Sequence, residues 1–211
     1  WNFGALVVLT LSPAGVSVKT LAVEALLAAD VDPSGAQAVI ARRSGDGAAH
    51  LERVELASLA VHPVTDVDGF SGSAVAWEDA GIVVWTGDMH VGGVATLFSP
   101  AGAVLKKAKT SRLGSFPTAL GVIAGEIAAS TKEEQTLLFH AGKTHKLAGF
   151  GEPAALCSAT GLASLGGKVV SLPDGKTVAK LAGDEWSETL LSRDGRVVVG
   201  FDSDGDAVEF E

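Results

Sequence analysis

The chain has 211 residues, of which 47% are hydrophobic and 19% charged, and its 16 basic and 25 acidic residues give a formal net charge of −9. This composition is too apolar for a disordered chain, and glycine and charge interrupt it too often for a membrane span. The acidic balance repels phosphate backbones and anionic membranes, so it argues against nucleic acid as the principal partner and against direct membrane insertion.

The N-terminal region predicts a buried strand. The apolar run 5–11 stops at the turn Ser12-Pro13-Ala14-Gly15, and no basic residue precedes it, which distinguishes it from a signal segment. The sequence begins at Trp1, so a targeting segment that was removed or is not included stays open. Cys157 is the single cysteine and lies in an apolar run, which predicts a small buried residue, excludes a disulfide framework and favours an intracellular location.

A strand–turn–strand phrase recurs along the chain. Residues 9–16 (LTLSPAGV) recur as 96–103 (TLFSPAGA), with looser copies at 137–143 and 170–176. Each copy is an apolar run, a glycine-containing turn and a second run. Glycine supplies the positive φ that such tight turns require, so these copies predict β-hairpins.

A second phrase alternates with the first. Residues 24–41 contain an apolar run, the turn Asp32-Pro33-Ser34-Gly35 and a second apolar run, and residues 188–200 repeat this order around Asp194-Gly195. Both copies continue through another Asp-Gly pair into a further strand. The order is therefore strand, turn, strand, Asp-Gly turn, strand.

This order resembles the inner three strands of a WD40-type or related β-propeller blade. The second strand of each unit is expected to start near Ala25, Ala74, Ala119, Ala155 and Thr189, which lie 34 to 49 residues apart; a propeller blade takes roughly 40–45 residues. No unit ends in Trp-Asp or opens with Gly-His, so the resemblance carries only the architecture. It implies an all-β fold in which residues 1–211 form one domain, either a β-propeller of about five blades of antiparallel strands or a partial propeller from a larger one.

The N-terminal strands raise a question of closure. Residues 5–11 and 16–23 are expected to be the last strand of one blade and the first strand of the next, and the rest of that opening blade is missing. Either the N-terminal strand completes the final blade, or the propeller is completed elsewhere. A helix over residues 19–29 and 125–135 is the structural alternative, because both segments contain good helix formers.

No motif indicates catalysis, a cofactor or a metal. Gly69-Phe70-Ser71-Gly72 lacks the spacing of a nucleophile elbow, and residues 202–206 do not fit a calcium loop. His140 and His145 are expected to face each other across a hairpin, where they could bind a metal, but no third ligand is evident. A propeller hydrolase would need carboxylates around a central channel, for which Asp30, Asp79 and Glu126 are the candidates.

The candidate partner-binding residues are aromatic and apolar. Trp77 and Trp85 fall on neighbouring strands, and Met89 and His90 follow in the next loop, which suggests a contact site for a protein partner. The alternative is that both tryptophans fill gaps between blades. The sequence therefore favours a non-enzymatic protein–protein interaction scaffold that is a subunit or domain of a larger assembly and has other proteins as its partners. A ligand- or glycan-binding propeller and a propeller hydrolase are the alternatives.

Overall fold

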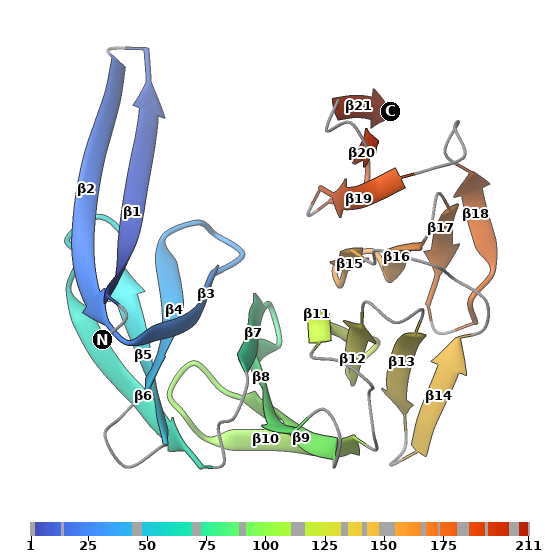
Figure 1. The fold of residues 1–211 in the computed structure, drawn as a ribbon, viewed down its shortest axis with the longest axis horizontal. Helices are drawn as coiled ribbons and strands as arrows, with labels where there is room; N and C mark the ends of the chain where they lie inside the picture. Colours follow the sequence, from blue (N-terminus) through green and yellow to red (C-terminus); the bar gives the residue numbers. More distant parts are fainter. Residues whose placement is uncertain are drawn as a thin grey trace.

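The computed structural model of the chain describes residues 3–13, 15–43, 48–68, 73–88, 92–110, 117–131, 135–140, 143–147, 155–165, 168–172, 174–180, 186–192, 194–202 and 207–210. Within these ranges the regular structure consists of β-strands, which form antiparallel sheets (Figure 1). The expected all-β fold is confirmed. The helix alternative is wrong for the described parts of 19–29 and 125–135, because pairing between strands overrides the helix propensity of their alanine and leucine residues. The described residues include no helix that is long and apolar enough to cross a membrane.

Five of the sheets have the strand order of propeller blades, in which each strand pairs with the next along the chain. Blade 1 contains β3 (Leu26–Val31), β4 (Gln37–Arg43), β5 (Ala49–Glu55) and β6 (Val61–Val67). Blade 2 contains β7 (Ser73–Glu78), β8 (Gly81–Asp88), β9 (Gly92–Phe98) and β10 (Val104–Thr110). Blade 3 contains β11 (Pro117–Ile123), β12 (Glu126–Thr131), β13 (Gln135–His140) and β14 (Lys143–Leu147). Blade 4 contains β15 (Ala155–Cys157), β16 (Leu162–Leu165), β17 (Lys168–Ser171) and β18 (Thr177–Lys180), and blade 5 contains β19 (Trp186–Leu191), β20 (Val198–Asp202) and β21 (Ala207–Phe210).

The five blades follow one another around an arc (Figure 1). Their first strands lie on the inside of the arc, and contacts run from β3 to β7, from β7 to β11, from β11 to β15 and from β15 to β19. In Figure 1 the two ends of the arc do not meet: the N-terminal strands lie at one end and blade 5 at the other. The described strands therefore form a β-propeller of about five blades, as the repeat of strands and turns predicts. The ring is open in this structure, a point that the sequence left undecided.

The N-terminal strands differ from the prediction. β1 (Phe3–Ser12) and β2 (Gly15–Glu24) pair with each other along their whole length, so they form one hairpin and do not belong to two successive blades. The blade numbering shifts as a result: the positions expected in second strands, such as Ala74 and Ala155, lie in the first strands of their blades. The physical reason is local, because the turn between β1 and β2 brings two long strands together before either can join a blade.

The predicted hairpin turns are confirmed where the structure describes them. Gly35, Gly102 and Gly195 have φ of 71°, 87° and 69°, and each donates its amide to the carbonyl oxygen three residues earlier, at 2.8–2.9 Å. In the turns that end at Gly102 and Gly195 this acceptor is a serine, whose hydroxyl also accepts a backbone amide. The glycine and serine positions of the repeat are thus explained by backbone geometry.

Apolar clusters join each blade to the next. Blades 1 and 2 share a cluster around Trp77 and Leu51, and blades 2 and 3 share one around Trp85 and Ile127. Smaller clusters join blade 3 to blade 4 and blade 4 to blade 5. In β8, the residues Ile82 to Trp85 are consecutive and completely buried, because the sheet is covered on both faces. The core of the molecule is therefore a series of interfaces between sheets.

Polar contacts also connect the blades near the ends of their first strands. The Asp30 carboxylate on β3 accepts the amide of Trp77 on β7 at 2.7 Å. The Ser158 hydroxyl of blade 4 donates to Glu78 of blade 2 at 2.6 Å and accepts the amide of Val122 of blade 3 at 3.1 Å. One serine thus links three blades.

Candidate functional site

The structure places the two predicted tryptophans inside the molecule. Trp77 is 5% exposed in the interface between blades 1 and 2, and Trp85 is 0% exposed in the interface between blades 2 and 3. They lie on opposite faces of blade 2. Trp77 is paired with Ile82 and shares its face, and Trp85 is three residues from Ile82 along β8, so its side chain points to the other face. This is the gap-filling role that the sequence left as the alternative. Met89 and His90 lie outside the described residues, so partner binding by these two residues stays a prediction.

The candidate channel carboxylates lie at three separate places, and two of them make contacts between blades. Asp30 accepts a backbone amide across the interface between blades 1 and 2, and Asp79 lies in the exposed turn between β7 and β8. Glu126 forms an ion pair with Lys106 at 2.5 Å, and the same ammonium donates to the Gly125 carbonyl oxygen at 3.0 Å. Lys106, on the outer strand β10 of blade 2, thus connects blades 2 and 3. These contacts hold the sheets together.

The two candidate metal-ligating histidines are not opposite each other. In the register of β13 and β14, His140 pairs with Lys143 and His145 pairs with Leu138. The turn is thus one residue earlier than the sequence suggested. Among the residues that the structure describes, no group of three or more histidine, cysteine, aspartate or glutamate side chains could hold a metal ion.

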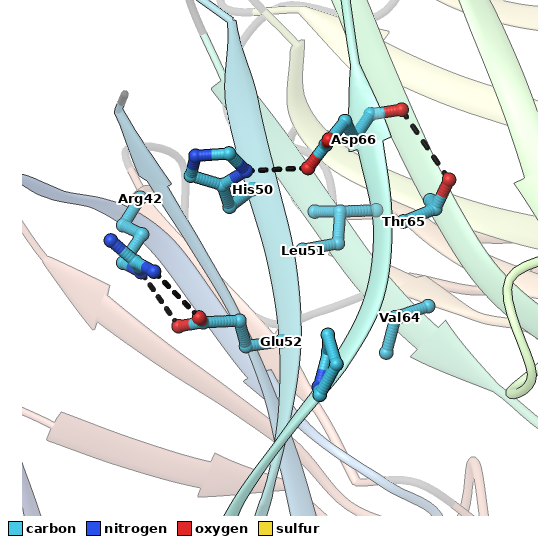
Figure 2. A pocket seen from close by; sticks show the side chains of 8 residues that line it. Arg42, His50, Leu51, Glu52, Val64, Thr65 and Asp66 are labelled. Atoms are coloured by element: carbon cyan, nitrogen blue, oxygen red, sulfur yellow. Dashed lines mark hydrogen bonds and ion pairs between the residues drawn. The ribbon is translucent and has the colours of Figure 1, made fainter. Parts of the chain in front are cut away.

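A groove on the face of blade 1 brings polar side chains together from β4, β5 and β6 (Figure 2). Its volume is about 290 Å³. Arg42, His50 and Asp66 lie in one cross-strand row, and Glu52 lies two residues further along β5 on the same face. The lining consists of Arg42, His50, Leu51, Glu52, Pro63, Val64, Thr65 and Asp66.

One ion pair and one contact between a histidine and a carboxylate fix the polar side chains of the groove. The Arg42 guanidinium donates from Nε and Nη2 to the two carboxylate oxygens of Glu52, both at 2.8 Å. His50 Nδ1 lies 2.5 Å from Asp66 Oδ1. The hydrogen bonds that Arg42 donates to Glu52 raise the pKa of Arg42, burial opposes the rise, and the charges of Glu52 and Glu24 add to it. Paired side chains of this kind lose less rotamer freedom when a ligand binds, so the groove is preorganised.

A second hollow continues the groove toward the N-terminal hairpin. It has a volume of about 200 Å³ and lies between the base of β2 and the strands β4, β5 and β6. Arg42 and Glu52 line both hollows, so this ion pair stands between them. Glu24 of β2 adds a third carboxylate to those of Glu52 and Asp66.

The outer strand of blade 1 is shaped by a bulge. The register of β5 and β6 shifts between Leu51, which pairs with Thr65, and Glu52, which pairs with Pro63, so Val64 is the extra residue. Proline has no backbone N–H to donate. The outer strand β6 tolerates Pro63 because one edge of an outer strand has no neighbouring strand to bond with. The turn of blade 2 at Gly102 packs against the Val64 carbonyl oxygen. The bulge thus fixes the outer wall of the groove against the next blade.

The groove combines charged side chains with an imidazole and the hydroxyl of Thr65. A hydrolytic triad would require a nucleophile at the second imidazole nitrogen of His50. The Thr65 hydroxyl, which lines the groove, instead donates to the Asp66 carbonyl oxygen at 3.4 Å. The sequence did not reveal this set, although charged residues at alternate positions of two neighbouring strands (Arg42 and then His50 and Glu52) were its visible signal.

No protein-family model matches the sequence, and neither does any curated protein. Solved structures do match its fold. An acylaminoacyl peptidase from Pyrococcus horikoshii is 13% identical with a TM-score of 0.62, and the match covers 100% of this chain and 44% of that chain. The β-propeller domain of the Trilobed protease from Pyrococcus furiosus, described as having an open velcro topology, is 8% identical with a TM-score of 0.58 over 99% of this chain and 78% of that one.

A WD40 β-propeller domain is among the similar structures as well. The domain of Doa1 is 13% identical with a TM-score of 0.60, and the match covers 96% of this chain and 75% of that chain. This chain spans less than half the length of the peptidase chain that it matches. At these identities the comparisons establish the propeller fold, which interaction domains and peptidases share, so function has to be argued from the site.

Proposed function

We propose that the protein is a non-enzymatic interaction scaffold whose groove on blade 1 binds a segment of a partner protein. The observation that carries this proposal is the groove itself, an open surface hollow in which Arg42 is ion-paired with Glu52 and His50 contacts Asp66 (Figure 2). Preorganised polar groups beside apolar surface are the usual composition of a peptide-binding site. The rigid blades behind the groove hold these groups in place.

The charge of the groove selects the chemistry of the partner segment. Three carboxylates (Glu24, Glu52 and Asp66) face one guanidinium and one imidazole. Glu52 is occupied by Arg42 and its side chain is 15% exposed, whereas the Asp66 side chain is 70% exposed. Asp66 is therefore the carboxylate best placed to meet a cation from outside. The partner segment is expected to carry lysine or arginine.

The placement of the other carboxylates supports a scaffold in preference to a hydrolase. Asp30 and Glu126 are engaged in contacts between blades, and Asp79 lies in an exposed turn. A hydrolase would use such groups around a common reacting centre, whereas here each serves a different part of the fold.

The test is charge reversal in the groove. The tagged chain is purified from its source, co-purifying proteins are identified by native mass spectrometry, and the affinity of the contacting segment is measured by calorimetry. Asp66→Lys should weaken binding about tenfold and reduce its salt dependence, because it replaces the exposed carboxylate by a cation. Asp79→Lys makes the same charge change in the exposed turn of blade 2 and should bind like the wild type.

Three results would overturn the proposal. The first is equal affinity of the Asp66→Lys and wild-type proteins for every co-purifying partner. The second is that no other protein co-purifies with the tagged chain. The third is turnover of peptide or ester substrates by the purified chain.

A further inference from the structure

The hairpin of β1 and β2 covers only part of the face of blade 1 that carries the groove. Ile40 and Val54 pack against Val23 of the hairpin. Glu52 pairs with Ile40 and is two residues from Val54, so it shares their face, yet it lines the open groove. Blade 1 has four strands, whereas the sheet of the hairpin beside it has two (Figure 1). The hairpin therefore leaves part of this face uncovered, and the groove lies in that part.

β2 is the strand of the hairpin that borders the uncovered part. β1 contacts β3, the inner strand of blade 1, whereas Lys19 of β2 donates to the Ala57 carbonyl oxygen in the turn between the outer strands β5 and β6. On the hairpin side, the hollow next to the groove is lined by residues 21–24 of β2 and by no described residue of β1. Side chains alternate between the two faces of a strand, so four consecutive lining residues indicate that the hollow reaches the edge of β2. This edge, along residues 21–24 and opposite β1, is called the open edge below.

The open edge has backbone groups that no strand pairs with. Within the part of the chain that the structure describes, β2 pairs with β1 alone. Alternate residues of the open edge therefore direct their N–H and C=O groups away from β1, toward the hollow. Directly after β2, the Ala25 carbonyl oxygen accepts the amide of Arg43 on β4 at 3.0 Å, which fixes this end of the edge against blade 1. A held strand edge of this kind is a template for pairing with another strand.

A strand on the open edge would lie above the groove. Neighbouring strands are about 4.8 Å apart and packed sheets about 10 Å apart, so every second side chain of the added strand would point down toward blade 1. These side chains would meet Val61, which is 42% exposed, and the Asp66 side chain, which is 70% exposed. The carboxylates of Glu24, Glu52 and Asp66 disfavour an acidic strand at this place. The complementary occupant is an extended segment whose downward side chains are basic and apolar.

We propose that the partner segment binds as a strand on the open edge of β2, where it becomes the third strand of the hairpin sheet above the groove. This inference rests on the proposed function and adds the mode of recognition to it. Main-chain hydrogen bonds to β2 supply affinity that does not depend on sequence, and the downward side chains supply specificity. The segment is therefore expected to alternate, with a lysine or arginine for Asp66 and an apolar residue two positions away.

The test uses the synthetic peptide Ac-Thr-Val-Thr-Lys-Thr-Val-Thr-NH2, titrated into the full ¹⁵N-labelled chain and followed by NMR. Binding should shift the amides of residues 21–24 and of Asp66, and it should slow hydrogen exchange at alternate amides of the open edge. Two matched peptides carry N-methyl groups, one on the amides of its valines and lysine and the other on those of its threonines. These two sets of amides point to opposite edges of an extended strand. One methylated peptide should therefore bind about tenfold more weakly than the parent, and the other should bind about as well as the parent.

The charge of the peptide tests the groove separately from the edge. Replacing its lysine by norleucine, or Asp66 of the chain by lysine, should weaken binding about tenfold and leave the difference between the methylated peptides unchanged, whereas Asp79→Lys should bind like the wild type.

The possible results separate the two proposals. Equal binding of both methylated peptides overturns strand addition, and the groove proposal survives if Asp66→Lys still weakens binding. A clear difference between the methylated peptides without any effect of the lysine or of Asp66→Lys supports strand addition and contradicts the charge preference of the groove. No binding of the parent peptide at millimolar concentration, or protection at another outer strand such as β10, also overturns strand addition on β2.

Discussion

Blade 2 and the hairpin of β1 and β2 both contain antiparallel strands rich in valine, but these apolar side chains are buried in blade 2 and many of them are exposed in the hairpin. In blade 2 both faces are covered, and Ile82, Val83, Val84 and Trp85 are completely buried in sequence. In the hairpin one face packs on blade 1 while Leu9 on the other face is 61% exposed. An apolar strand in this fold is thus stabilising only to the extent that a neighbouring sheet covers it, and within the described part of the chain the hairpin has a face that no sheet covers.

The comparison also separates stability from function. The interfaces between blades use their polar groups as well as their apolar ones, as the contacts of Asp30 and Ser158 show. The groove, and the face of the hairpin that carries Leu9, contain polar and apolar groups that are not buried between two blades. Binding surfaces are therefore expected around blade 1 and the hairpin, whereas blades 2 and 3 form the structural centre.

Truncating the largest buried side chain should break the structural centre. Trp85→Ala removes an indole that is 0% exposed between blades 2 and 3, so it should lower the free energy of unfolding by about 3–5 kcal/mol. Leu9→Ala, at a side chain of the hairpin that is 61% exposed, should lower the free energy of unfolding by less than about 0.5 kcal/mol in dilute protein. Urea unfolding followed by circular dichroism measures both. Equal losses at the two positions would contradict the contrast between covered and uncovered strands.

Two glycine turns test how closely neighbouring blades approach. Gly102 has a φ of 87°, and a Cβ there would lie 2.2 Å from the Val64 carbonyl oxygen of blade 1, whereas a Cβ at Gly35, with a φ of 71°, would meet nothing within 4 Å. Gly35→Ala should therefore cost only the backbone strain, about 1 kcal/mol. Gly102→Ala should cost about 1–3 kcal/mol more, because the backbone of blade 1 must shift. Similar unfolding midpoints for the two variants would show that the turn of blade 2 is not fixed against blade 1.

Removing the hydroxyl that links three blades should have a smaller effect. Ser158→Ala removes the hydroxyl that accepts the Val122 amide and that donates to the Glu78 carboxylate. The expected loss in unfolding free energy is about 1–2 kcal/mol, the usual cost of an unsatisfied partly buried group. Ser34→Ala, which removes a hydroxyl in an exposed turn, should cost less than about 0.5 kcal/mol. A loss at Ser158 no larger than at Ser34 would contradict its role as a link.

The parts of the fold that follow from local chemistry were predictable from the sequence. Gly102 and Gly195 occupy turns with positive φ, and the Ser-Pro-Ala-Gly and Asp-Gly phrases mark them directly. The blade spacing followed from these turns. The turn between residues 5–11 and 16–23 was predicted, but not that these two strands form a separate sheet, because residues 5–11 have the same composition as a strand inside a blade.

The candidate site depended on register, which the sequence does not specify on its own. Arg42, His50 and Asp66 come together only because β4, β5 and β6 pair in the register that places them in one row. The tryptophans show the same limit: an aromatic residue on a strand fills an interface or contacts a partner according to the face on which it lies, and both Trp77 and Trp85 face neighbouring blades. Periodicity indicates that a face is covered, but not by what.

Acid titration should give the smallest effect and should distinguish the turns from the blade interfaces. The Ser192 hydroxyl donates to Asp194 at 2.6 Å and the Arg196 amide donates at 3.1 Å, and these hydrogen bonds lower the pKa of Asp194. Burial raises the pKa of Asp32. Hydrogen bonds from the Ser34 hydroxyl and from the amides of Gln37, Ser34 and Ala36 outweigh burial, so the pKa of this carboxyl is lowered as well.

A carboxyl whose pKa is lower in the folded state contributes stability above its unfolded pKa of about 3.9, and that stability is lost as the pH falls through the folded value. Asp194→Asn should therefore slightly lower the unfolding midpoint at pH 7 and reduce the loss between neutral and acid pH. Ser192→Ala should raise the pKa of Asp194 toward its ordinary value, as measured by carboxyl-carbon NMR titration. If that pKa is the same in the folded chain and in a short peptide of the turn, the hydrogen bonds do not act on the carboxylate, and the acid sensitivity of the protein must come from its ion pairs, such as Arg42 with Glu52 in the groove.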